Sequence, residues 1–369
     1  MWCLILLFLF TQTCVSEEIE PVVTLYSPEH SVAKFSSDMK YLAIGTFDGK
    51  VEIYSCKDWR KVTELITRYS VSSIDFSSDG RFVVASCADK VDIWDMVSFE
   101  KIIRLERENS AWQYIEFSPK CDKVSAFGLR FETEKKYTLE QKADLANVLA
   151  WTFGGAYITA RTGGAIRYSG VPVDSSVRVE EITKSKGTMA TWNTKTWYLI
   201  DSAEDESISH TNILRREGKI LVQQDRIYDQ VEQKTVFELD KNLAVRYLTF
   251  CLNTKLKAYF IEGKEEKPRI ITKTPAKFEL GRIEKKSLFP VKILKFSPNG
   301  RILCSDDKNN RLHLWDTFSQ KEIIPLKLHR NQIVLLEFSP DDNYLLSGDG
   351  QNIYVWNIAE IENLFGGRK

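Results

Sequence analysis

Catalytic and metal-binding motifs are missing from this chain, and each absence narrows the chemistry it can do. Its four histidines, His30, His210, His313 and His329, form no HExxH or other close pair, so no histidine-based zinc site is indicated. The cysteines show no Cys-x-x-Cys spacing, and no glycine-rich segment leads into the Lys-Ser/Thr of a phosphate loop. A Gly-x-Ser-x-Gly nucleophile elbow is also absent. We therefore expect no catalytic residues, no metal and no cofactor.

An excess of charge of one sign is missing as well. Lys plus Arg and Asp plus Glu are 51 each, so the net charge is zero. The overall electrostatic field therefore gives no reason to expect nucleic acid or an anionic membrane as a partner. Basic residues outnumber acidic ones ten to five between Lys255 and Lys286. This stretch is the one place where nucleic-acid contact comes into question, although a solvated loop is the favoured interpretation. The acidic stretch from Asp201 to Glu206 is interpreted in the same way.

No apolar run is long enough to span a bilayer, but the chain begins with a short one. Trp2 to Phe10 are all apolar, and small residues follow near Cys14 to Ser16. Residues 1–16 therefore predict a signal peptide or hydrophobic leader, and residues 17–369 the folded domain. Beyond residue 16 the cysteines are odd in number and scattered, and no Asn-x-Ser/Thr acceptor exists. These features favour the cytoplasm or nucleus, with the secretory pathway as the alternative.

What the chain does contain is a repeat. A Phe-Ser landmark recurs at Phe35, Phe76 and Phe117 in steps of 41 residues, and again at Phe296 and Phe338, 42 residues apart. Repeats of this length are typical of propeller blades, each of which must pack on its neighbours to bury its faces. A closed ring of such units is a single domain.

The clearer copies predict the strands within a blade. A strand ends at each landmark, a turn such as Asp79-Gly80 or Asn299-Gly300 follows, and a second apolar segment comes next. A third alternating segment ends in an aromatic residue, as in Val91 to Trp94 and Leu312 to Trp315. Val22 to Tyr26 precede the first landmark strand and are expected to complete the last blade, which closes the ring.

Two third segments end in Trp94-Asp95 and Trp315-Asp316, with Trp356-Asn357 and Tyr228-Asp229 as near variants. Together with the Phe-Ser turns, these pairs resemble the WD-repeat family of β-propellers over residues 22–365. The resemblance implies an all-β propeller of four-stranded antiparallel blades and a noncatalytic platform for other macromolecules. The family's Gly-His pair is missing, and His329 comes nearest to it. We therefore expect the buried histidine network of such repeats to be incomplete.

The number of blades depends on the middle of the chain. The gap from Phe117 to Phe250 would hold three repeats of ordinary length, with Trp151 and Trp192 in the landmark positions. This gives eight blades, and seven blades with a large insertion is the alternative.

Two groups of residues are candidates for function. Those just before the landmarks form a mixed-charge ring that is expected to line a wet central channel: Lys34, Asp75, Glu116, Lys295 and Glu337. The loops that lead into the first strands meet at one rim, where a rigid scaffold presents binding residues. The protein-binding candidates on that rim are Tyr69, Trp112, Lys186, Phe289 and Asn331; Trp112 also suits the core.

The sequence thus predicts a noncatalytic scaffold that binds other proteins at the rim. The alternative is a secretory-pathway propeller enzyme or ligand-binding protein with its site in the central funnel. It would require acids, histidines or metal ligands gathered around the axis.

Overall fold

The computed structural model describes most of the chain as β-sheet. The described residues are 19–139, 150–153, 156–161, 165–169, 177–205, 213–217, 220–223, 226–229, 234–238, 245–251, 257–261, 269–271, 277–279, 293–307, 309–319 and 321–366. The predicted leader, residues 1–16, lies outside them. Within these ranges there is one helix, α1 (Ile358–Gly366), and no helix is long and apolar enough to cross a membrane.

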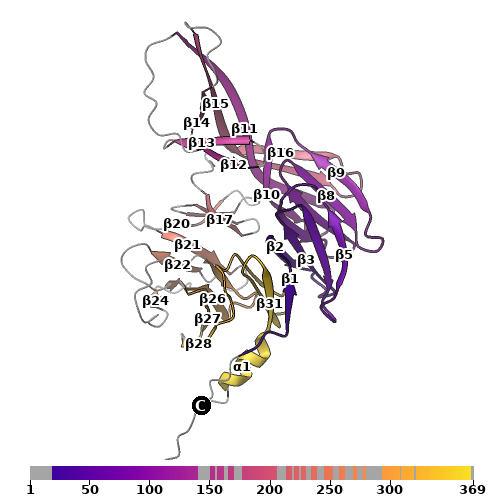
Figure 1. Ribbon diagram of the computed structural model, residues 1–369, viewed down its shortest axis with the longest axis vertical. Coiled ribbons are helices and arrows are strands. Elements are labelled where there is room, and N and C mark those ends of the chain that lie inside the picture. The colour runs from indigo at the N-terminus through magenta and orange to yellow at the C-terminus, as the bar shows by residue number, and fades with distance from the viewer. Residues whose placement is uncertain are drawn as a thin grey trace, which may run out of the picture.

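The described strands form seven antiparallel sheets, which we number as blades in chain order (Figure 1). Blade 1 holds β2 (His30–Phe35), β3 (Tyr41–Thr46), β4 (Lys50–Ser55) and β5 (Lys61–Ile66), and blade 2 holds β6 (Val71–Phe76), β7 (Phe82–Cys87), β8 (Lys90–Asp95) and β9 (Lys101–Glu106). Blade 3 is built on β10 (Ser110–Phe117), β11 (Lys123–Leu139), β15 (Val177–Asn193) and β16 (Leu199–Asp205).

The later blades follow the same pattern. Blade 4 holds β17 (Ile213–Glu217), β18 (Ile220–Gln223), β19 (Arg226–Asp229) and β20 (Lys234–Glu238), and blade 5 holds β21 (Val245–Phe250), β22 (Lys257–Ile261), β23 (Arg269–Ile271) and β24 (Lys277–Glu279). Blade 6 holds β25 (Leu294–Phe296), β26 (Ile302–Asp306), β27 (Leu312–Asp316) and β28 (Lys321–Leu326). Blade 7 holds β29 (Leu335–Phe338), β30 (Tyr344–Gly348), β31 (Asn352–Asn357) and, from the other end of the chain, β1 (Val23–Tyr26). The first strands of successive blades contact one another from blade 4 to blade 7, and blade 7 continues to blades 1, 2 and 3. The order of these first strands is β17, β21, β25, β29, β2, β6 and β10.

The pairing of β1 with β31 confirms the expected joining of the two ends in one sheet. Val23 lies opposite Val355 and Tyr26 opposite Asn352. Buried His30 secures this joint: its Nδ1–H donates to the carbonyl of Ser27 (2.7 Å), and its Nε2 accepts from the amide of Gly350 (3.2 Å). Gly348 leaves room for the ring, since a Cβ there would lie 2.2 Å from Nε2.

The serine of the Phe-Ser landmark explains why the turns repeat. In blade 2 the Ser77 hydroxyl donates to Asp79 (2.6 Å) and accepts the amide of Phe82 (2.8 Å). Equivalent bonds join Ser36 to Asp38, Ser297 to Asn299 and Ser339 to Asp341. Each hydroxyl therefore satisfies polar groups that the hairpin turn would otherwise leave unpaired.

The third strands supply the core between blades. Trp94, Trp315 and Trp356 are at most 2% exposed. Trp94 packs in one cluster with Val51 and Ile53 of the preceding blade, so burial of this ring joins two sheets. In blade 7 the Nε1–H of Trp356 and the Nε2 of His329 both meet the Ser347 hydroxyl, each at 2.8 Å. His329 Nδ1 has no partner in the described residues, so this network is incomplete, as expected.

Blade 3 corrects the count of eight. Trp192 is not a first-strand landmark: it lies in β15, opposite Val124, as Trp94 lies opposite Val83 in blade 2. Trp151 lies in β12 (Ala150–Phe153), which with β13 (Ala156–Arg161) and β14 (Ala165–Ser169) is inserted between the second and third strands. The described residues thus fit the alternative of seven blades with an insertion.

The insertion is a projection of the blade itself. β11 and β15 stay paired over their whole length, from Lys123 opposite Asn193 to Leu139 opposite Val177. Figure 1 shows them running out of the body of the molecule, with β13 and β14 beside them. At their base Arg107 and Arg130 both pair with Glu204. These ion pairs join the loop before β10 to β11 and β16.

Candidate functional site

Strand direction places two kinds of loop on one rim of the propeller. In an antiparallel blade the loop into the first strand and the turn from the second to the third strand lie at the same end. We call this end the first-strand rim and the opposite end the turn rim. Tyr69 and Asn331 lie in loops of the first-strand rim, and both side chains are exposed. The insertion of blade 3 leaves from the same rim.

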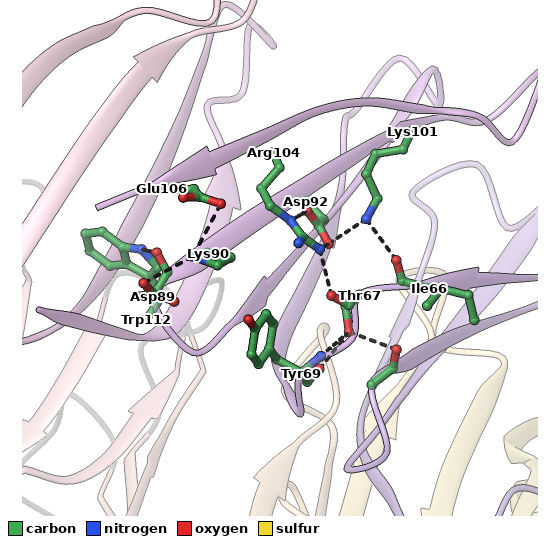
Figure 2. Close-up of polar contacts among 11 residues, drawn as sticks. Ile66, Thr67, Tyr69, Asp89, Lys90, Asp92, Lys101, Arg104, Glu106 and Trp112 are labelled. Atoms are coloured by element: carbon green, nitrogen blue, oxygen red, sulfur yellow. Dashed lines mark hydrogen bonds and ion pairs between the residues drawn. The ribbon is translucent and has the colours of Figure 1, made fainter. Parts of the chain in front are cut away.

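A buried ion network fixes the loop that carries Tyr69 (Figure 2). Asp92, in β8, is fully buried and bonds Lys101 at 2.8 Å and Arg104 at 2.6 Å. The two cations also reach back to the preceding blade: Lys101 donates to the carbonyl of Ile66 (2.8 Å) and Arg104 to that of Thr67 (2.7 Å). A buried carboxylate with such partners is well compensated, so it can hold the end of β5 in place.

The same loop is held from the other side by the turn of blade 1. The amide and the hydroxyl of Thr67 both donate to the carbonyl of Gly49 at 2.9 Å. Gly49 has φ +86°, and a Cβ there would lie 2.8 Å from the Tyr69 nitrogen. Only glycine suits this position, because it alone combines that conformation with so close a backbone approach.

Tyr69 itself presents an aromatic ring next to charges. Its side chain is 44% exposed, and the Lys90 ammonium lies 6.0 Å from the ring centre. Lys90 pairs with Asp89 and Glu106, both at 3.3 Å. Figure 2 shows the ring between Thr67 and this charged group. The arrangement is therefore an exposed aromatic residue on a fixed loop beside polar groups.

The other rim candidates are not brought together with Tyr69 as one cluster. Trp112 is 1% exposed and lies below the rim, where its indole N–H donates to the carbonyl of Asp89 (3.2 Å). Lys186 lies in β15 opposite Arg130, at the base of the insertion, and Asn331 lies in blade 7. Phe289 is outside the described residues.

Sequence reasoning missed Asp92, Lys101 and Arg104, although a signal exists. An acid or histidine in the third strand pairs with a residue nine positions later in the fourth: Asp92 with Lys101, Glu52 with Lys61, and His313 with Glu322. The contact of such pairs with the neighbouring blade cannot be seen in one repeat.

The predicted channel ring contains interacting charges. Lys295 and Glu337 form an ion pair. Burial disfavours the charge of Lys34, but Glu337, Asp75 and Glu116 outweigh it and raise the Lys34 pKa. Burial raises the pKa of Asp75, against the effects of Lys34 and of the Phe117 amide, which donates to it at 2.8 Å. Among the described residues no three His, Cys, Asp or Glu side chains form a metal site.

Comparison with known proteins agrees with this architecture. A family model for the WD domain, G-beta repeat, matches residues 60–95 and 320–357, each a fourth strand followed by three strands of the next blade. Pre-mRNA-processing factor 17 of Homo sapiens and that of Mus musculus are 22% identical to this chain over 182 residues. These matches cover 47% of this chain but only 30% of the relatives, so most of their length has no counterpart here.

Solved structures show the same fold over nearly the whole chain. A chain of the mitotic checkpoint complex matches with a TM-score of 0.57 at 14% identity, covering 93% of this chain and 94% of that one. The β-propeller domain of Myceliophteria thermophila Cps50 (Swd1) matches with a TM-score of 0.53 at 12% identity, covering 92% and 99%. The class of this protein is therefore the β-propeller. Within that class, residues 60–95 and 320–357 match WD40 repeats, as the Trp-Asp pairs and Phe-Ser turns predicted.

Proposed function

We propose that the protein is a noncatalytic scaffold that holds protein partners on its first-strand rim. The observation that carries this proposal is the loop of Tyr69: a buried ion network and a glycine contact fix its backbone, while the ring stays exposed. Rigid presentation of an aromatic residue lowers the entropy lost on binding.

Three further features support the proposal. The WD40 repeats and the propeller fold are those of platforms for other proteins, and one structural neighbour is a chain of a named complex. The insertion of blade 3 extends the surface of the same rim. Within the channel group Lys295 and Glu337 form an ion pair, and Asp75 accepts the amide of Phe117.

Purification from native cells under gentle lysis tests the scaffold directly. We expect the protein to elute with other proteins in fixed ratio, and the purified chain to leave a panel of hydrolase substrates unchanged. Elution as a monomer together with substrate turnover would overturn the proposal.

The second candidate is a small ligand in the central funnel, favoured by the group around Lys34. A Lys34→Met variant that loses a bound small molecule while keeping its protein partners would support it. N-terminal sequencing of the native protein addresses the secretory version, since a start at Glu17 would mean cleavage after residue 16.

A further inference from the structure

Three exposed aromatic side chains follow one another along the first-strand rim. Tyr26 at the end of β1 is 71% exposed, Phe47 in the turn between β3 and β4 is 57% exposed, and Tyr69 is 44% exposed. We call these three residues the aromatic arc. Large apolar side chains grouped on one surface are typical of interaction sites, whereas single ones need no explanation.

Backbone hydrogen bonds join the three loops of the arc. The loop after Tyr26 is tied to blade 7 by the amide of Glu29, which donates to the carbonyl of Gly350 at 3.0 Å. The carbonyl of Glu29 accepts the amide of Phe47 at 2.8 Å. In the same turn as Phe47, the carbonyl of Gly49 accepts hydrogen bonds from Thr67, which lies in the loop of Tyr69. The rings therefore stand on one connected framework, which is a property of a preorganised binding surface.

The loops of the arc and the residues around Lys90 contain carboxylates. Asp48 adjoins Phe47 in sequence, and Glu29, whose carbonyl holds the Phe47 amide, is exposed. Lys50 pairs with Asp48, and Lys90 is shared between Asp89 and Glu106. Arg68 adds one exposed cation to the same loop as Tyr69. These four carboxylates and three cations leave an excess of one negative charge around the arc, which is complementary to a positive group.

The Tyr69 ring already attracts a cation, since Lys90 lies 6.0 Å from its centre. An aromatic face near carboxylates suits a guanidinium above all, because that group stacks on rings and donates two hydrogen bonds to a carboxylate at once. We propose that the aromatic arc binds an extended, arginine-bearing segment of a partner protein. This inference rests on the scaffold function and names the chemistry of its partner.

The test uses two labelled synthetic peptides. One alternates glycine and arginine, and the other alternates glycine and citrulline, a residue that keeps the shape of arginine without its charge. Fluorescence anisotropy measures their binding to the full-length protein. We expect the arginine peptide to bind at least about tenfold more tightly, and Phe47→Ala and Tyr69→Ala each to weaken it by about fivefold. The matched control is Phe318→Ala, which removes an aromatic ring that is 84% exposed on the turn rim and should change nothing.

Several results would overturn the proposal. Equal binding of the two peptides would remove the role of the guanidinium, and an equal loss in Phe318→Ala would remove the role of the arc. Absence of binding up to about 1 mM peptide would also count against it. Thermal unfolding of each variant separates lost binding from lost folding. If native partners still co-elute but the arginine peptide cannot displace them, the scaffold function stands and this inference fails.

Discussion

His313 shows how one residue of the repeat can acquire a charge at neutral pH. Its Nδ1 lies 2.5 Å from Glu322 and its Nε2 3.2 Å from Asp307. Burial would lower its pKa, but the two carboxylates outweigh burial and raise it to about 9. In the sequence His313 only fails to form a close pair with another histidine; the structure supplies the two acids that bind it.

This pKa predicts a loss of stability at alkaline pH. The folded value lies above the unfolded value near 6.5, so the stabilisation is complete below pH 6.5 and is lost as pH rises through about 9. We expect the free energy of unfolding to fall by on the order of 2 kcal/mol across that window. Denaturant titrations at several pH values measure it. His313→Gln should flatten the profile; a profile as steep as that of the wild type would contradict the assignment. Burial lowers the pKa of His329 to about 4, so its effect falls in a separate, more acidic window.

The buried tryptophans of the third strands set the stability of blade interfaces. Trp94 is 2% exposed and Trp315 1% exposed, and the Trp315 indole N–H also donates to the Ser305 hydroxyl at 3.1 Å. Changing either residue to Ala should cost about 3–5 kcal/mol in the free energy of unfolding, because it opens a cavity between two sheets. Equilibrium denaturation gives the value. A cost below about 1 kcal/mol at both positions would mean that the interfaces are not packed as described.

At the scale of elements, the turn between the third and fourth strands joins blades 1, 2 and 3 to the blade before each of them. An aromatic residue with positive φ in this turn packs edge-on against an aromatic residue of the preceding blade: Trp59 against Tyr344, Phe99 against Tyr41 and Trp197 against Phe82. The motif also explains a failure of the sequence analysis. Asn193 accepts the amides of Lys195 and Thr196, as Asp95 accepts those of Val97 and Ser98, so Trp192-Asn193 is a third-strand end.

This turn contact carries its own prediction. Trp59→Ala should lower stability by about 1–3 kcal/mol, since the ring packs on both Tyr344 and Phe35 and so links blade 1 to blade 7. Phe318→Ala, in the corresponding turn of blade 6 but 84% exposed, should change it by less than about 0.5 kcal/mol. Parallel thermal melts compare the two. Similar losses in both variants would show that the aromatic contact is not what joins the blades.

At the scale of the whole molecule, the repeat predicted the fold because most of its contacts are local. Phe76 and Ser77 with Asp79, or Val91 to Trp94, lie within one repeat, so their spacing is visible in the sequence. Blade 3 was not predicted because an insertion separates its second strand, β11, from its third strand, β15. In the other blades only a short stretch of the sequence separates the second and third strands. The contacts that hold the Tyr69 loop were not predicted for a related reason. Asp92 binds Arg104, and Arg104 donates to the carbonyl of Thr67, which belongs to another blade.

The central claim is that partners are held on the first-strand rim, and capture of native partners by variants of matched thermal stability tests it most directly. Tyr69→Ala, combined with Phe289→Ala at the second rim position that the sequence predicts, should weaken capture, each change removing about 1–2 kcal/mol of binding. Tyr69 is 44% exposed and so supplies contact area without supporting the core. Asp79→Ala and Asn299→Ala, in turns of the opposite rim, should leave capture unchanged. Loss of partners only in the Asp79 and Asn299 variants would place the binding surface on the turn rim and contradict the account.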